Sequence, residues 1–201
     1  WIYDHAWAFG GLRSTVFLAG DSAGAHLACW YATALAKPEL LAEAAVDRTI
    51  PRESIRGLLL FYGVYDVRQA AEARFPFVRS LARCLLGDDP ELAARRARAV
   101  SPICHVGPGA PPMLLCAGEP DLLHRQSIAM ADVLRRHGVP HRLLIFDRRR
   151  YPAAHHAFLN FYSLRCARIA MQETLRFMDG LRRDGNEASR GACPRATGAP
   201  G

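Results

Sequence analysis

The chain has 201 residues, of which 50% are hydrophobic, and its formal net charge is +7. This length and apolar content predict a globular domain with a sizeable core, and they exclude a chain that is disordered throughout. The basic residues occur in short groups such as 148–150, without interleaved aromatic residues. Since no nucleic-acid-binding module is recognisable, we expect these groups to form a solvated face and expect no nucleic-acid partner.

The apolar runs and the cysteines bear on the cellular compartment. No run approaches the roughly 20 residues that span a bilayer, so we expect no membrane span in this chain. The six cysteines contain no CxxC pair, which argues against a zinc site and favours free thiols in a reducing, cytoplasmic compartment. The chain starts at Trp1, and residues 1–9 resemble the last turns of a helix that closes at Gly10 and Gly11. We therefore expect an N-terminally incomplete fold.

Four short apolar runs, bounded by turn residues, predict strands at 15–20, 55–63, 112–118 and 141–146. Their hydrophobicity is continuous rather than alternating, which is typical of parallel strands that are covered on both faces.

Helical patterns lie between and after these strands, at 22–37, 122–137 and 163–181. The alternation of strands and helices indicates the α/β class. Between the second and third strands, residues 64–106 carry helical pieces and many charges, and we expect a helical insertion there. After Arg182 the composition shifts to Gly, Pro, Ser, Ala and Arg, which predicts a disordered tail over 183–201.

The stretch TVFLAGDSAGAHLACW, residues 15–30, places Gly20, Ser22 and Gly24 at the junction of a strand and a helix. A GxSxG sequence in this context predicts a sharp turn that exposes the serine hydroxyl at the end of the sheet. We expect side chains at either glycine position to collide in this turn. The helix that follows would direct the Ala23 amide at a developing oxyanion. The alternative is that Ser22 only caps the helix and that Asp21 is a polar turn residue.

A nucleophilic serine requires a histidine base and an acid that orients it, here in the order serine, acid, histidine. Asp121, in AGEPDLL, follows the third strand, and His155 and His156, in AAHHAFLNF, follow the fourth. The carboxyl ends of parallel strands share one edge of the sheet, so we expect Ser22, Asp121 and His156 to meet there. His156 is preferred because Phe158 can pack its loop, and His155 is the reserve. The alternatives are that Asp121 is a helix N-cap and that the histidines are merely exposed.

Four segments, in order, resemble the hormone-sensitive-lipase-like branch of α/β-hydrolases, also called the α/β-hydrolase fold-3 group of esterases. They are GDSAGAHLA at 20–28, SPI at 101–103, GEPDLL at 118–123 and HHAF at 155–158. The resemblance covers about residues 1–181. It implies the α/β-hydrolase fold, a three-layer sandwich around a mostly parallel sheet.

The resemblance also implies a serine hydrolase of carboxylic esters that works through an acyl-enzyme. Ser22 would be the nucleophile, His156 the general base and then acid, and Asp121 the residue that orients His156. It implies no metal and no organic cofactor, and a small-molecule ester as substrate. Phe75 and Phe77 of the insertion could line an apolar pocket.

This chain departs from that family's pattern before its first predicted strand. No HGG segment, which supplies further oxyanion donors in the family, occurs in it, and only about 14 residues precede the strand. We therefore expect residues 1–182 to be the C-terminal part of a catalytic domain that lacks its N-terminal strands, with 64–106 over the site. Two alternatives stay open: an arylformamidase-like amide hydrolase, and a truncated, non-catalytic product that binds through an exposed sheet edge, where a dimer could also form.

Overall fold

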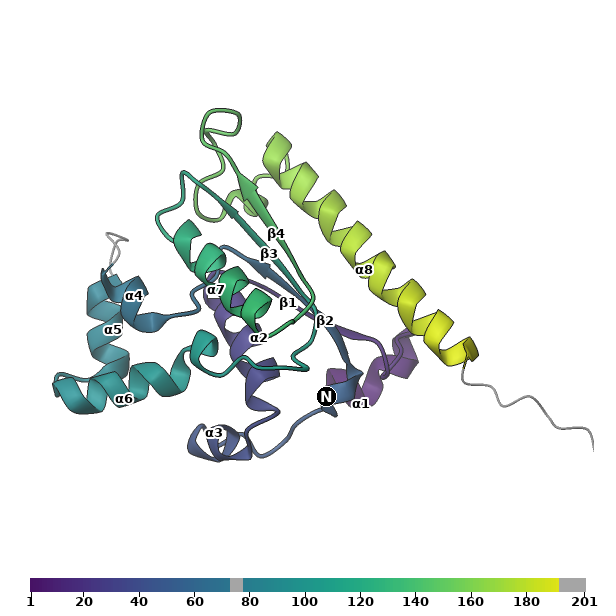
Figure 1. Ribbon diagram of the computed structural model, residues 1–201, viewed down its shortest axis with the longest axis horizontal. Helices are drawn as coiled ribbons and strands as arrows, with labels where there is room; N and C mark the ends of the chain where they lie inside the picture. Colours follow the sequence, from purple (N-terminus) through teal and green to yellow (C-terminus); the bar gives the residue numbers. More distant parts are fainter. Residues whose placement is uncertain (73–77, 192–201) are drawn as a thin grey trace, which may run out of the picture.

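The computed structural model describes residues 1–72 and 78–191, and Figure 1 shows a twisted parallel sheet at its centre. The strand order β1-β2-β3-β4 follows the sequence. All four predicted strands are confirmed within two residues. They are β1 (Val16–Asp21), β2 (Ile55–Phe61), β3 (Met113–Gly118) and β4 (His141–Phe146).

Helices cover both faces of this sheet, which gives the predicted three layers (Figure 1). The helices α2 (Ala23–Ala34) and α7 (His124–Arg136) pack on one face, and α8 (Arg165–Gly191) packs on the other. Successive residues of one strand enter opposite cores: Leu58 and Leu60 pack on the α2 and α7 side, whereas Leu59 packs on the α8 side. This burial on both faces explains the continuous apolar runs of β2 and β3. The expectation is wrong for β1 and β4, which are only partly buried because they lie at the two ends of the strand order.

The N-terminal segment forms α1 (Ile2–His5) and the 3-10 turn η1 (Ala6–Phe9), and Gly10 ends it in the left-handed conformation, as predicted. A short helix that the sequence did not predict, α3 (Pro38–Glu43), follows α2. The sequence prediction ended the preceding helix at residue 37, directly before Pro38, and placed no helix after it. Proline is equally suited to the first position of a helix, where no amide hydrogen is needed, and α3 begins there.

The 3-10 turn η2 (Arg52–Ser54) lies directly before β2, and the segment between β2 and β3 carries most of the remaining helices. They are α4 (Val67–Glu72), α5 (Val78–Leu86), α6 (Pro90–Val100) and the 3-10 turn η3 (Pro102–Cys104). Asp89 caps α6 by accepting from the Leu92 amide at 2.7 Å. Phe75 and Phe77, named above as pocket residues, lie outside the described residues.

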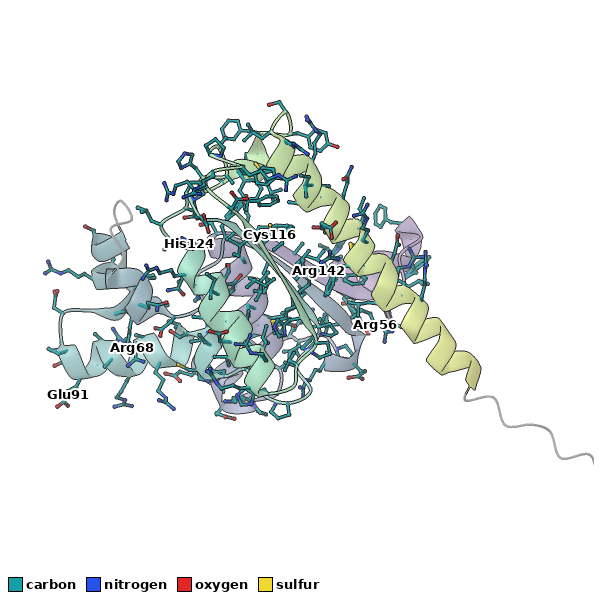
Figure 2. The ribbon with its side chains drawn as sticks, turned by 45° about the horizontal axis from the view of Figure 1, so that its top comes forward. Arg56, Arg68, Glu91, Cys116, His124 and Arg142 are labelled. Carbon is teal, nitrogen blue, oxygen red and sulfur yellow. The ribbon has the colours of Figure 1, made fainter. Side chains whose placement is uncertain are left out.

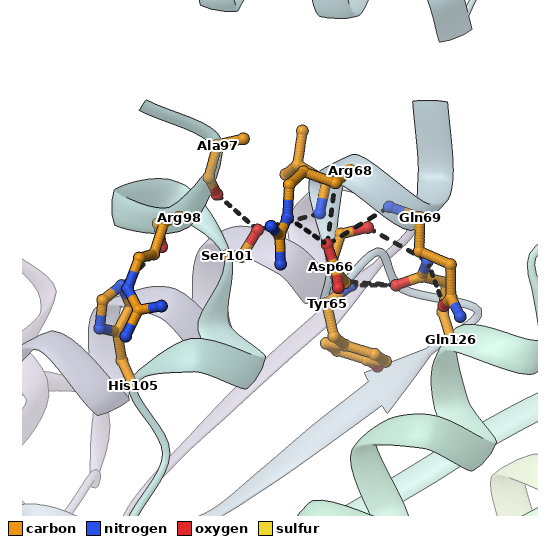
Figure 3. A network of polar contacts seen from close by, with 10 residues as sticks. Tyr65, Asp66, Arg68, Gln69, Ala97, Arg98, Ser101, His105 and Gln126 are labelled. Atoms are coloured by element: carbon orange, nitrogen blue, oxygen red, sulfur yellow. Dashed lines mark hydrogen bonds and ion pairs between the residues drawn. The ribbon is translucent and has the colours of Figure 1, made fainter. Parts of the chain in front are cut away.

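A buried glutamine fixes the start of this helical segment to α7. Figure 3 shows the Gln126 side chain facing Tyr65, Asp66 and Gln69. Its Oε1 accepts from the amides of Tyr65 (2.9 Å) and Asp66 (2.8 Å), and its Nε2 donates to the Asp66 carbonyl (3.1 Å) and to Gln69 Oε1 (2.9 Å). All four hydrogen-bonding positions of this amide are therefore used.

The last helix is longer than predicted, because α8 continues to Gly191 instead of ending near Leu181. Residues 183–191, predicted as the start of a disordered tail, are therefore helical. An existing helix lengthens readily, because adding a residue to it is much easier than starting a new helix. Residues 192–201 lie outside the described residues. Two arginines labelled in Figure 2 join the sheet to α8: Arg142 forms an ion pair with Glu173, and Arg56 donates to the Leu181 carbonyl at 3.3 Å.

Candidate active site

Ser22 lies between β1 and α2 with φ +50° and ψ −116°, a conformation that costs a non-glycine residue on the order of 1–3 kcal/mol. Two hydrogen bonds hold it: its amide donates to the Phe61 carbonyl at 2.9 Å, and its carbonyl accepts from the His26 amide at 3.1 Å. The Ser22 side chain makes no capping hydrogen bond to α2, so the interpretation as a simple N-cap is wrong. The hydroxyl is left for another partner.

The two glycines beside Ser22 have different surroundings. A Cβ atom on Gly20 would lie 2.2 Å from the carbonyl carbon of Gly24, a distance that no side chain tolerates. A Cβ atom on Gly24 would meet only Asp21 Oδ1, at 3.8 Å. The expected collision therefore exists at Gly20, where a side chain would strike the backbone of Gly24. The expectation is wrong for Gly24, where a side chain would have room.

The structure brings Ser22, His156 and Asp121 together. His156 Nε2 lies 2.8 Å from Ser22 Oγ, and His156 Nδ1 lies 2.9 Å from Asp121 Oδ2. Since an ionised carboxylate only accepts hydrogen bonds, Nδ1 carries the proton and donates it to Asp121. Nε2 is then the acceptor for the Ser22 hydroxyl, which is the arrangement that a general base needs.

Asp121 is held from its other side as well. Its side chain has no exposed area, and its Oδ1 accepts from the Leu123 amide at 2.9 Å. The residue that caps α7 is Leu123, so Asp121 is not the helix N-cap that the alternative proposed. One carboxylate oxygen thus fixes the loop after β3, and the other faces His156.

The acid and histidine loops approach closely at Gly118, which sequence reasoning did not single out. A Cβ atom there would lie 2.0 Å from the Ala154 carbonyl oxygen. The signal in the sequence was a glycine at the last position of a strand, which often marks a close approach of two backbones. This contact brings the loop that carries His156 over the end of β3.

His156 itself lies against an aromatic group. Its ring centroid is 5.1 Å from that of Tyr62, and Tyr62 also contacts Phe158 edge-on at 5.4 Å. Phe158 is buried, which agrees with the expectation that it packs the histidine loop, and Phe146 continues the group at 5.4 Å. His155, the reserve, is exposed. Tyr62 is a neighbour of the site that the sequence did not indicate.

Ala23 is the first residue of α2, so its amide lies at the helix end that carries partial positive charge. This places the donor expected for an oxyanion directly after Ser22.

Four further histidines, none of which the sequence marked as a site residue, bond to backbone carbonyls. They are His26 to Val64 (2.9 Å), His105 to Arg98 (2.9 Å), His124 to Asp121 (2.7 Å) and His141 to Val139 (2.8 Å). Burial lowers the pKa of His26 and of His105, and hydrogen bonds to backbone carbonyls oppose this shift in both.

Within residues 1–72 and 78–191, no group of three His, Cys, Asp or Glu side chains is arranged to hold a metal ion. Over the same residues, no helix has the length and apolar character needed to cross a membrane. The cysteines of this part, at positions 29, 84, 104, 116 and 166, are free thiols, and Cys193 lies outside it.

Comparison with known proteins adds sequence relatives to this geometry. A family model described as the alpha/beta hydrolase fold matches residues 1–160. Esterase LipQ of Mycobacterium tuberculosis is 32% identical over 169 residues, which cover 79% of this chain and 36% of the relative. The probable carboxylic ester hydrolase LipM of the same organism is 27% identical, over 85% of this chain and 38% of its own length. The chain thus spans little more than a third of these relatives.

Solved structures share the same fold. Esterase B from Lactobacillus rhamnosis superposes with a TM-score of 0.81 at 23% identity, covering 94% of this chain and 60% of that one. Esterase 2 from Thermogutta terrifontis superposes with a TM-score of 0.59 at 27% identity, covering 92% and 61%.

Proposed function

Because the chain belongs to the α/β-hydrolase-fold family, we propose that it carries the catalytic triad of a serine hydrolase that cleaves carboxylic esters. Ser22 is the nucleophile, His156 the base and Asp121 the residue that orients the base. The observation that carries the proposal is the pair of contacts made by His156, one ring nitrogen to Ser22 Oγ at 2.8 Å and the other to Asp121 Oδ2 at 2.9 Å. Residues 1–182 contribute to the catalytic domain, and the substrate is a small-molecule ester, consistent with relatives named as esterases.

In the first step, Ser22 Oγ attacks the ester carbonyl carbon while His156 Nε2 takes the hydroxyl proton. The carbonyl oxygen becomes an oxyanion, and the Ala23 amide donates to it, an interaction worth about 3 kcal/mol in the transition state. Collapse of this intermediate breaks the bond to the alkoxy oxygen. His156 returns its proton to that oxygen, so an alcohol leaves and Ser22 is acylated.

In the second step, water attacks the acylated Ser22 while His156 removes one of its protons. The second intermediate collapses with return of that proton to Ser22 Oγ, which releases the carboxylic acid and restores the free serine. Throughout, Asp121 accepts the Nδ1 hydrogen bond and stabilises the imidazolium.

The proposal is tested by labelling the 201-residue chain with a fluorophosphonate probe, which reacts with an activated serine. We expect Ser22→Ala to abolish labelling, and His156→Ala and Asp121→Asn to slow it by about 10³-fold or more. The matched control is His155→Ala, which removes the neighbouring exposed histidine and should label at the parental rate. Hydrolysis of an aryl ester and of a formamide by the unlabelled parent protein then separates the esterase from the amide hydrolase.

A folded chain that does not react with the probe would contradict the proposal and favour a non-catalytic role. The observation behind that second candidate is the exposed apolar character of the N-terminal segment, residues 1–12, which precedes β1 at the end of the strand order. Its large side chains are 68–80% exposed and comprise Trp1, Ile2, Trp7, Phe9 and Leu12.

A further inference from the structure

Tyr62 stands out because the chemistry above gives it no part, although it contacts the proposed base. It directly follows β2, it is fully buried, and its backbone has φ +40°. A non-glycine residue in this region costs on the order of 1–3 kcal/mol and persists only where the surrounding structure imposes it. Here the Tyr62 amide donates to the Cys116 carbonyl of β3 at 2.7 Å, which fixes the strained backbone to the next strand.

The direction of the Tyr62 ring follows from this backbone. The ring centroid lies 5.1 Å from that of His156, with 60° between the planes, which is within the range of aromatic contact. The His156 side chain is 20% exposed, so it is largely enclosed by protein, and Tyr62 supplies part of that enclosure. The torsion that turns a histidine ring has broad energy wells, so the orientation of the ring depends on its contacts.

We propose that Tyr62 is a positioning residue whose ring holds the His156 imidazole in the orientation that faces Ser22 with Nε2 and Asp121 with Nδ1. The inference rests on the proposed function, because this orientation matters for catalysis only if His156 is the base that acts on Ser22. The contact itself belongs to the fold, since Tyr62 directly follows β2 and His156 lies in the loop after β4. Phe158, two residues after His156, packs on Tyr62 with ring centroids 5.4 Å apart.

The ring, rather than the hydroxyl, has this role. The hydroxyl is buried near the Asp21 carboxylate and the Leu159 backbone, yet it makes no hydrogen bond of normal geometry within the described residues. Burial raises the pKa of the Tyr62 phenol, and the nearby Asp21 charge raises it further. The phenol is therefore neutral at ordinary pH, and removing its oxygen takes no charge away from the imidazole.

The test is the ¹⁵N–¹H spectrum of the histidine rings in the full chain, which distinguishes the two neutral tautomers without any turnover. His156→Ala assigns the signals. We expect the parent to hold the Nδ1–H tautomer and Tyr62→Phe to keep it, whereas Tyr62→Leu should show a mixture. The matched control is Tyr151→Leu, since Tyr151 contacts Phe146 at 5.0 Å in the same aromatic group, and it should keep the parental tautomer.

Labelling kinetics provide the second readout: Tyr62→Leu should slow fluorophosphonate labelling by about tenfold, and Tyr62→Phe by less than about threefold. A parental tautomer and rate in Tyr62→Leu would overturn the proposal, as would a mixture of tautomers in the parent. Should Tyr62→Leu not fold, Tyr62→Met, whose flexible apolar side chain fills the site without a ring, takes its place with the same expected mixture. Loss of the parental tautomer in Tyr62→Phe would also contradict a role for the ring. A parent that keeps the tautomer but never labels refutes the proposed function and leaves the role of Tyr62 standing.

Discussion

Gly20 and Gly24 give a prediction that separates backbone crowding from helix propensity. We expect Gly20→Ala to cost about 3 kcal/mol or more, because the new Cβ atom would lie 2.2 Å from rigid backbone at Gly24. We expect Gly24→Ala to be neutral or to stabilise by about 0.5–1 kcal/mol, because its Cβ atom has room and alanine favours the helix. Urea unfolding of both variants measures the difference, and equal losses in the two would contradict it.

The three residues that meet in the candidate site, Ser22, Asp121 and His156, could be named from the sequence because each has a local signal. Ser22 lies in a motif, and Asp121 and His156 directly follow strands whose carboxyl ends must share one edge. Tyr62 has no such signal. Its positive φ and its contact with His156 arise from the packing of β2, β3 and a loop nearly 100 residues away, and a tyrosine after a strand reads as an ordinary core residue.

At the scale of elements, Gln126 joins α7 to the start of the helical segment. We expect Gln126→Ala to destabilise the chain by about 2–4 kcal/mol, because it leaves the amides of Tyr65 and Asp66 without their acceptor in a buried site. The control is Gln69→Ala, which removes one of the four hydrogen bonds and should cost less than about 1 kcal/mol. Urea unfolding at neutral pH measures both. A Gln126→Ala variant as stable as Gln69→Ala would show that the network adds little.

The strands and α7 were predictable to within two residues, whereas the C-terminal end of α8 and the presence of α3 were not, and the reason is physical. A strand buried on both faces must be apolar along its whole length, so its ends coincide with turn residues. Helix ends depend more on the surrounding chain. Proline can end one helix and begin another, as it does at the start of α3. A long helix extends readily, as α8 does past Leu181.

At the scale of the whole molecule, the parallel sheet explains how distant segments form one site. Ser22 follows β1, Asp121 follows β3 and His156 follows β4, so all three lie at the carboxyl edge of the sheet. The two cores pack against the sheet from its two faces, so the site forms only while the fold is intact. A partly buried titrating group that alters the stability of the fold therefore bears on the site.

His26 is such a group, because it lies on α2 one turn after Ser22 and burial lowers its pKa in the folded chain. In the unfolded chain its pKa is about 6.5. Above that pH both states are neutral at this position, and stability does not change there. As the pH falls below about 6.5, the unfolded chain takes up the proton first, so the free energy of unfolding decreases until the folded-state pKa is passed.

We therefore expect the free energy of unfolding, measured in urea, to be lower at pH 5.5 than at pH 7.5. His26→Gln, whose side chain can still donate to the Val64 carbonyl, should lose less stability over the same interval. His105 is shifted in the same direction, so a double variant, His26→Gln with His105→Gln, should show a smaller loss still. If His26→Gln lost as much stability as the parent between these two pH values, burial of His26 would not be a source of the acid sensitivity.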